Sequence, residues 1–325
     1  MKNFFKYSGI LLLIIAVLFL SGIIYFNSSY PKVITKKNIK IEQTAERVER
    51  GKYLVNHVAA CIDCHSSRDY TLYTAPMIKG TEGIGGERFG EEMGFPGNIY
   101  AKNITPSNLK DWTDSELLNA ITAGINKDGK ALFPVMPYPN YAQMNIEDIK
   151  DIIAYIRTLK PVENNVPETE LNFPMNFIVK TIPADYNSKP KPNRSDSINY
   201  GKYLITLAAC FDCHSPADHG KVIEGKEYSG GNEFSLPSGK LKSANITPDK
   251  LTGIGSWTKD TFIKRFKAFT DSSRIYKLDF SKDFQTIMPW TLYAGMKEED
   301  LGAIYDYLRS IKPVYNKVTV FTPSK

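Results

Sequence analysis

The sequence is short of several features that would assign it to common functional classes. It has only four cysteines and four histidines in 325 residues. It has no flavin or quinone fingerprint, and its glycine-rich stretch 80–86 is not set between a strand and a helix, which argues against a dehydrogenase in its own right. The formal charge of +6 lies mostly in the tails, and residues 44–160 and 196–314 are near neutral. A nucleic-acid-binding surface is therefore not expected.

The four cysteines all fall in two copies of one pentapeptide, Cys-Xaa-Xaa-Cys-His. This is the attachment signature of a c-type haem. On one helical turn, cysteines at i and i+3 share a face where each thiol can add to a haem vinyl group, and the adjacent histidine can reach the iron. The sequence therefore predicts two covalently bound haem c groups, held by Cys61, Cys64 and His65 and by Cys210, Cys213 and His214.

Two other uses of the cysteines are conceivable. The four thiols could form one tetrahedral zinc site, or each pair could be a redox-active dithiol that happens to precede a histidine. A histidine in the same position twice, with matching flanks, favours haem attachment over both.

The flanks of the two motifs form an internal repeat. Residues 51–54 recur at 201–204, Asn-Ile-Thr-Pro at 103–106 recurs at 245–248, and a tryptophan follows each copy. Met-Pro at 136–137 recurs at 288–289, and a Tyr-Xaa-Arg helix end at 155–157 recurs at 307–309. Ordered matches of this kind predict two tandem domains. We expect domains at 44–162 and 196–314, a strap at 163–195 and a tail at 315–325.

Residues 1–43 are expected to form a membrane anchor and a tether. The uncharged run from Tyr7 to Phe26 has the length, about 20 residues, that a helix needs to cross a bilayer. A cleaved signal peptide is the alternative, but the apolar stretch is long for that role, and no Ala-Xaa-Ala site follows it. We therefore favour a retained single-pass anchor.

Lysines flank this run on both sides, so charge does not settle its orientation. Haem attachment through cysteines takes place in the exported compartment. The expected location is thus the cytoplasmic (inner) membrane, with both haem domains in the periplasm.

Hydrophobic periodicity predicts a mainly helical chain. A helix is expected from Thr44 to His57 and again over 197–209, each leading into a Cys-Xaa-Xaa-Cys-His motif. Amphipathic helices end each domain at Lys-Pro, and shorter helices follow Trp112, where residues 113–116 form a capping box, and Trp257. The Gly/Pro-rich stretches 79–97 and 225–239 read as long loops around the haems, and the apolar island 173–179 predicts an ordered strap.

The sixth ligand of each iron is expected to be methionine. His57 and His219 lie too close to the motifs to reach the distal face, and we expect both at the surface. Met136 and Met288 stand before prolines in the same register of the repeat, and proline fixes an extended backbone that presents the thioether from a stiff loop. A His/Met pair closes both axial positions, which suits electron transfer and leaves no open site for a substrate. No catalytic residue is predicted.

With these motifs, the sequence resembles that of a dihaem c-type cytochrome of the class I fold. It is similar to the cytochrome subunits of membrane-bound alcohol and gluconate dehydrogenases. The resemblance runs over residues 44–314 and rests on the repeated landmarks. Those subunits typically carry three haems, whereas this chain has two motifs and an N-terminal anchor. The resemblance implies close helix crossings near Gly51 and Tyr155 and near Gly201 and Tyr307. It also places four side chains by the haem propionates: Asn103, Trp112, Asn245 and Trp257.

Two functions from different classes are compatible with this pattern. The first is an electron carrier between a periplasmic dehydrogenase or quinol-oxidising complex and a terminal oxidase. The second is a dihaem peroxidase, which has similar motif spacing but needs an open site or a distal histidine on one haem. The first repeat has no spare histidine except His57, so the carrier is the leading hypothesis.

Overall fold

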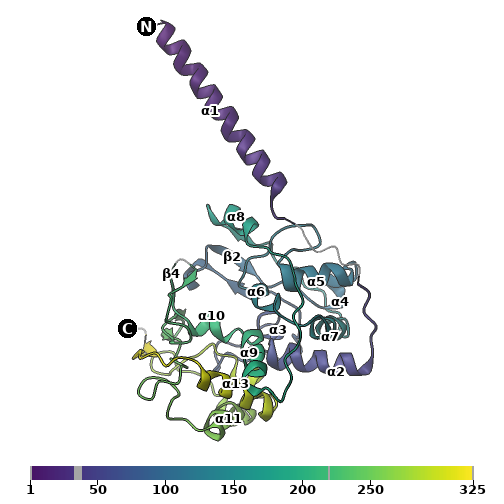
Figure 1. The fold of residues 1–325 in the computed structure, drawn as a ribbon, viewed down its shortest axis with the longest axis vertical. Helices are drawn as coiled ribbons and strands as arrows, with labels where there is room; N and C mark the ends of the chain where they lie inside the picture. Colours follow the sequence, from purple (N-terminus) through teal and green to yellow (C-terminus); the bar gives the residue numbers. More distant parts are fainter. Residues whose placement is uncertain (1, 33–38, 219, 324–325) are drawn as a thin grey trace.

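The computed structural model describes residues 2–32, 39–218 and 220–323, and part of the expected tether and His219 lie outside these ranges. Helix α1 (Lys2–Ser29) projects from the rest of the chain (Figure 1). It contains the whole run from Tyr7 to Phe26, and most of its apolar side chains are exposed. By length and composition α1 can cross a membrane, and it is the one helix among the described residues that can.

A pair of crossing helices frames the first repeat. Helix α2 (Ala45–Tyr53) is capped by Thr44 and continues as a π-helical turn (Leu54–Val58), close to the range expected from the sequence. Helix α7 (Ile146–Ile156) lies across it. A Cβ atom on Gly51 would lie 1.9 Å from the carbonyl oxygen of Asp151 and 2.8 Å from Cβ of Tyr155, so the backbones meet where only glycine fits.

The second repeat contains the same pair. Helix α9 (Ser197–Leu207), capped by Asp196, crosses α13 (Glu298–Ser310). A Cβ atom on Gly201 would lie 1.9 Å from the carbonyl oxygen of Ala303. The crossing implied by the resemblance is therefore present, and the closest approach falls one turn before Tyr307.

The shorter helices follow the sequence signals. In α5 (Asp114–Ala123) Thr113 and Glu116 form the expected capping box. In α11 (Lys259–Lys267) Thr258 accepts a bond from the backbone N–H of Thr261 but no box closes. The remaining α-helices among the described residues are single turns: α3 (Cys61–Cys64), α4 (Pro106–Leu109), α6 (Tyr138–Tyr141), α8 (Met175–Ile178), α10 (Cys210–His214) and α12 (Trp290–Tyr293).

Short antiparallel strands, which the sequence did not predict, occupy parts of the expected loops. They form three small sheets, in the orders β1-β2-β3, β4-β5 and β6-β7-β8. Their bounds are β1 (Arg88–Phe89), β2 (Gly97–Tyr100), β3 (Glu170–Leu171), β4 (Ala217–Asp218), β5 (Lys221–Val222), β6 (Glu233–Leu236), β7 (Gly239–Lys242) and β8 (Phe321–Pro323). Strands β3 and β8 come from the segments outside the repeats, so these segments extend sheets that the repeats begin.

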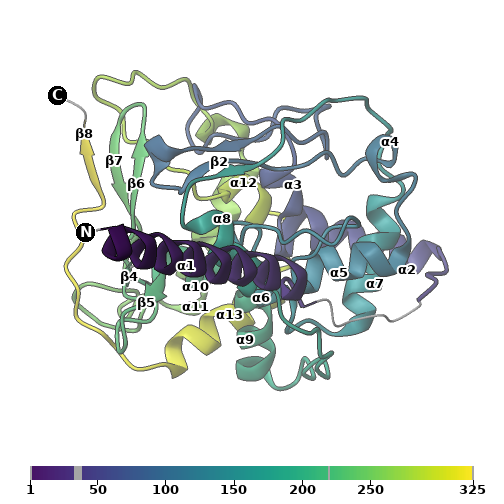
Figure 2. The ribbon, with the colours of Figure 1, turned by 90° about the horizontal axis from the view of Figure 1, so that it is seen from above.

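The main hydrophobic core runs through both repeats without a break. It joins buried side chains of the π-helical turn after α2 and of α7, such as Leu54 and Ile153, to those of α9 and α13, such as Leu204 and Leu301. Figure 2, in which α1 lies in front, shows α2, α5 and α7 of the first repeat beside α9, α13 and the strands β6 and β7 of the second. The repeats are therefore packed against each other.

The segment 163–195 lies against both repeats. Its β3 pairs with β2, and the buried Tyr186 donates from its hydroxyl to the carbonyl of Met144 at 3.0 Å. Further along, Lys191 and Arg194 each pair with a buried aspartate, one in each repeat. The segment is thus held at several points along its length.

Candidate cofactor sites

Each Cys-Xaa-Xaa-Cys-His motif begins at a sharp corner. The residue before the first cysteine, Ala60 or Ala209, has a left-handed backbone, with φ of 47° and 52°. A non-glycine residue rarely adopts this conformation, which costs about 1 kcal/mol or more. The corner ends the incoming helix and starts the one-turn helix α3 or α10, whose cysteines share a face. The same strain at both motifs points to a function for this corner.

The imidazoles of both motifs are oriented by backbone carbonyls. Nδ1 of His65 lies 2.7 Å from the carbonyl oxygen of Lys102, and Nδ1 of His214 lies 2.7 Å from that of Ala244. A carbonyl only accepts, so Nδ1 carries the proton and Nε2 keeps its lone pair for a metal. Burial lowers the pKa of both histidines, which keeps the imidazoles neutral at pH 7.

Each of these carbonyls belongs to the residue just before an Asn-Ile-Thr-Pro segment. Asn245 donates from its amide to Val314 and to Thr252, and its side-chain oxygen accepts from Thr247. Asn103 bonds in the same way to Val162 and Thr105. The asparagines therefore connect the loops that orient the histidines to the segments that follow α7 and α13. At Asn245 both amide hydrogens are used, which leaves none for a haem propionate.

A tyrosine that the sequence reasoning missed ties each methionine loop to its motif. Met136 and Met288 are half-buried against the core, and each precedes a one-turn helix, α6 or α12. The hydroxyl of Tyr141 donates to the carbonyl of Ala59 at 3.2 Å, and that of Tyr293 donates to Ala208 at 2.7 Å. The available signal was the tyrosine five residues after each methionine. These bonds fasten the expected sixth ligands to the corner that carries the cysteines.

The two motifs also contact each other's repeat. Arg68, nearly buried, bonds to the carboxylate of Asp63 at 3.1 Å and to the carbonyl of Ile287, beside Met288, at 3.1 Å. From the other side, the amide of Asn140 donates to Asp212 of the second motif at 2.7 Å. Each motif is therefore linked to the methionine loop of the other repeat. Neither Arg68 nor Asn140 lies in a repeated motif, so the sequence gives no sign of these contacts.

The prediction that His57 lies at the surface is wrong. Its ring is half-buried, with Nδ1 2.9 Å from the carbonyl oxygen of Leu292, and it packs against Gly295. The π-helical turn after α2 faces the second repeat, and the sequence of the first repeat alone does not indicate this contact. Burial is the largest effect on its pKa, which is lowered, so the ring is neutral at pH 7.

The zinc alternative is not supported by the geometry. Among residues 2–32, 39–218 and 220–323, no three side chains from cysteine, histidine, aspartate and glutamate are placed to hold one metal ion. Burial also raises the pKa of the Cys61 and Cys210 thiols to about 12, whereas a redox-active dithiol needs a thiolate. The paired cysteines, the neutral histidine with a free Nε2 and the nearby methionine loop instead fit a covalently attached haem.

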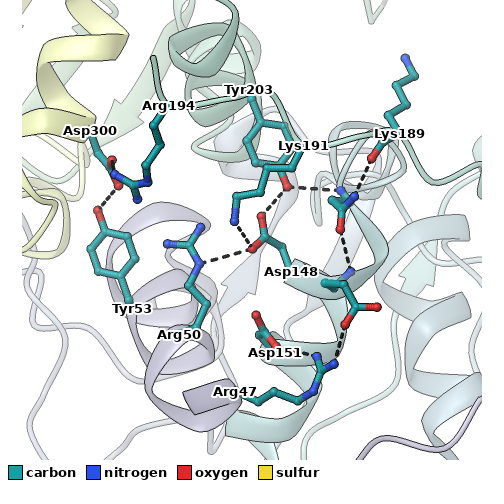
Figure 3. A network of polar contacts seen from close by, with 12 residues as sticks. Arg47, Arg50, Tyr53, Asp148, Asp151, Lys189, Lys191, Arg194, Tyr203 and Asp300 are labelled. Atoms are coloured by element: carbon teal, nitrogen blue, oxygen red, sulfur yellow. Dashed lines mark hydrogen bonds and ion pairs between the residues drawn. The ribbon is translucent and has the colours of Figure 1, made fainter. Parts of the chain in front are cut away.

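The two repeats are joined by a reciprocal pair of tyrosine–aspartate bonds (Figure 3). Tyr53 of α2 donates to Asp300 of α13 at 2.7 Å, and Tyr203 of α9 donates to Asp148 of α7 at 2.6 Å. Tyr53 and Tyr203 occupy the same place in the repeat, and so do the two aspartates. Each hydroxyl also accepts from a backbone N–H beside its aspartate's helix. Each repeat thus donates one tyrosine hydroxyl to an aspartate of the other repeat, and we call this pair of hydrogen bonds the Tyr–Asp exchange.

Cations balance the buried carboxylates of the Tyr–Asp exchange. Asp148 pairs with Arg50 at 3.3 Å and with Lys191 of the strap at 2.8 Å, and Asp300 pairs with Arg194 at 2.9 Å. Burial alone would raise the pKa of Asp148, but the two cations and the hydrogen bonds outweigh it and the pKa is lowered. The stabilisation is therefore present at neutral pH and is lost as the pH falls through the folded-state pKa.

We expect Tyr53→Phe to destabilise the folded chain by about 2 kcal/mol, because a hydrogen bond to a buried carboxylate is lost. Tyr203→Phe should have a similar effect. Urea unfolding at pH 7 measures both free energies, and Tyr315→Phe is the control, since Tyr315 is 62% exposed. A Tyr53→Phe variant as stable as the Tyr315→Phe control would contradict the role given to this bond.

Comparisons with known proteins agree with this chemistry. Residues 198–312 match the cytochrome c family. The chain is 30% identical over 276 residues to the fructose dehydrogenase cytochrome subunit of Gluconobacter japonicus, an alignment covering 81% of this chain and 52% of that protein. It is 26% identical over 292 residues to the gluconate 2-dehydrogenase cytochrome c subunit of Pantoea cypripedii, covering 85% and 62%. A dihaem cytochrome c-type protein of Cereibacter sphaeroides is 26% identical over 263 residues, covering 78% and 82%.

These alignments are longer than the family match at 198–312 and so reach into the first repeat. The chain spans about half the length of the first curated relatives it matches. The resemblance to cytochrome subunits of dehydrogenases is confirmed, and the family match supports covalently bound haem c.

Proposed function

We propose that this chain, which matches the cytochrome c family through residues 198–312, is a membrane-anchored dihaem cytochrome c. It carries electrons from a periplasmic dehydrogenase or a quinol-oxidising complex towards a terminal acceptor. The observation that carries the proposal is the duplicated site: each motif has an imidazole with a fixed Nδ1–H and a tyrosine that fastens a Met-Pro loop beside the cysteines. Haem bound at such a site supplies one-electron chemistry.

In this proposal the cysteines form the thioether attachments and the motif histidines are the proximal ligands. Met136 and Met288 are the sixth ligands. The partly buried position of both thioethers against the core supports this assignment. With both axial positions filled, the chain binds no substrate at iron, so its partners are redox proteins and not small molecules.

The dihaem peroxidase alternative is weakened by His57. Its ring is held against the second repeat by Leu292 and Gly295, so it already takes part in the contact between the repeats. Electronic and electron paramagnetic resonance spectra of the purified protein separate the two functions. Two low-spin haems with a near-infrared methionine-to-iron band are expected, and a high-spin haem with peroxide turnover would overturn the proposal.

The apolar helix α1 supports a membrane location. We propose that α1 anchors the chain in the cytoplasmic membrane and that both repeats face the periplasm, where thioether attachment takes place. The dehydrogenase subunits that the chain resembles support a partner of that class. Carbonate washing of membranes tests the anchor, because an integral protein stays in the pellet.

Met288→Leu should lower the reduction potential of one haem by on the order of 0.1 V, part of the ~0.8 V range that axial ligands span. The loss of the thioether removes the ligand that favours the reduced iron, while covalent attachment through the cysteines stays intact. A redox titration followed at the haem absorbance bands measures the change. Met296→Leu is the matched control, since Met296 is a buried core residue and a volume-conserving change there costs little. An unchanged titration of the Met288→Leu variant would reject the ligand assignment.

A further inference from the structure

The strap carries an exposed aromatic cluster next to the end of α1. Phe173 is 82% exposed and Ile178 is 45% exposed, and the Phe173 ring lies edge-on to that of Phe177 at 6.3 Å. Figure 1 shows α8, which contains Phe177 and Ile178, on the side of the body nearest α1. We call Phe173, Phe177 and Ile178 the α8 patch. Leaving large apolar side chains of this kind in water is unfavourable unless another surface covers them.

The depth of the α8 patch relative to a bilayer follows from its contacts with α1. The Phe177 ring centroid lies 6.1 Å from that of Phe26, and Lys180 bonds to the side-chain oxygen of Asn27 at 2.7 Å. Phe26 is the last apolar residue before the polar residues Asn27 to Ser29. If α1 spans a membrane, Phe26 lies at the boundary between hydrocarbon and headgroups, and Phe177 must lie at nearly the same depth.

The residues around the α8 patch are lysines and aromatic residues, the types that are common at a membrane interface. The ammonium of Lys180 lies 5.7 Å from the Phe177 ring, and that of Lys32 lies 5.8 Å from the ring of Tyr30. Tyr30 in turn stacks on Phe26 at 5.1 Å. Aromatic rings at headgroup depth with lysines reaching towards anionic lipids are typical of segments that rest on a bilayer surface.

We propose that the α8 patch inserts into the surface of the bilayer that holds α1, as a second membrane contact made by the strap. This inference rests on the proposed membrane anchoring. The contact fixes the tilt of the body against the membrane, because α1 and the patch together define two points of attachment. The strap would then set which face of the two repeats is open to redox partners.

The test measures the reactivity of single introduced cysteines in full-length holoprotein, reconstituted in phosphatidylcholine/phosphatidylglycerol liposomes. The native cysteines are already blocked as thioethers. Phe173→Cys is compared with Leu251→Cys on the second repeat, a matched control because Leu251 is 84% exposed. Leu13→Cys, in the middle of α1, reports on the anchor itself. Modification by a charged, membrane-impermeant maleimide is followed by mass spectrometry.

We expect the Phe173→Cys variant to react about tenfold more slowly than the Leu251→Cys variant in liposomes, and equally fast in denaturant. The Leu13→Cys variant should be unreactive in liposomes. If Phe173→Cys reacts as fast as Leu251→Cys while Leu13→Cys stays protected, the α8 patch proposal fails and the anchor stands. If Leu13→Cys is also reactive, the anchoring fails first. Protection at Phe173→Cys that disappears when the protein is diluted in lipid would indicate self-association and overturn the proposal.

Discussion

Replacing Cys210 and Cys213 together with alanine should leave one of the two covalently bound haems that we propose for this chain. In the proposed assignment each motif uses its own two thiols for attachment, and the structure places the pairs on separate one-turn helices, α3 and α10. Nothing in the first motif depends chemically on the thiols of the second. The haem content per polypeptide, measured from the pyridine haemochrome spectrum of the denatured chain, should therefore fall by half.

The reciprocal variant, Cys61→Ala with Cys64→Ala, is the matched partner of this experiment. It should also retain one haem, with the potential and spectrum of the other site. Because attachment is measured on the denatured polypeptide, a loss of folded stability does not obscure the result. Haem content that stays at two in either variant would show that the motif is not an attachment site. A content of one in the unmodified chain would overturn the dihaem assignment.

A second large effect is expected at the crossing of α9 and α13. Gly201→Ala should destabilise the fold by about 3 kcal/mol, at the upper end of the usual cost of overpacking. The added Cβ would lie 1.9 Å from the carbonyl oxygen of Ala303, and backbone cannot rotate away as a side chain can. The two helices must therefore separate along their length. Gly51→Ala should have a similar effect at the crossing of α2 and α7.

Gly302→Ala is the control for Gly201→Ala, since it lies in the same helix pair. A Cβ atom there would meet nothing closer than the Cδ atom of Lys259 at 3.5 Å, an ordinary contact. Alanine also favours a helix interior by up to about 1 kcal/mol over glycine, so this variant should be neutral or more stable. Chemical unfolding compares the two directly. Equal stability of the two variants would contradict the close crossing.

Local sequence signals were enough to find the helices that frame the sites. The apolar stripes of α7 and α13 repeat every three to four residues, and the Thr44 and Thr113 caps mark where α2 and α5 begin. The motifs identify their chemistry because thiol spacing and an adjacent imidazole are fixed by local helical geometry. These features depend on residues that are close together in the chain.

Features that depend on distant pairs could not be predicted. The partner of Tyr53 is Asp300, 247 residues away, and nothing in either helix alone indicates that the bonds cross between the repeats. The carbonyl that orients His65 belongs to Lys102, which any residue type could have supplied. His57 was misplaced for the same reason, since its neighbours come from the second repeat. Strands β3 and β8 are too short to leave a periodic pattern.

Because of the Tyr–Asp exchange, neither repeat is expected to be stable without the other. Severing the chain after residue 162 would strip Asp148 of Tyr203 and Lys191, and would strip Asp300 of Tyr53. A buried carboxylate without its partners carries a heavy desolvation cost. Although each repeat carries its own set of sequence landmarks, the two repeats are expected to melt as one cooperative body.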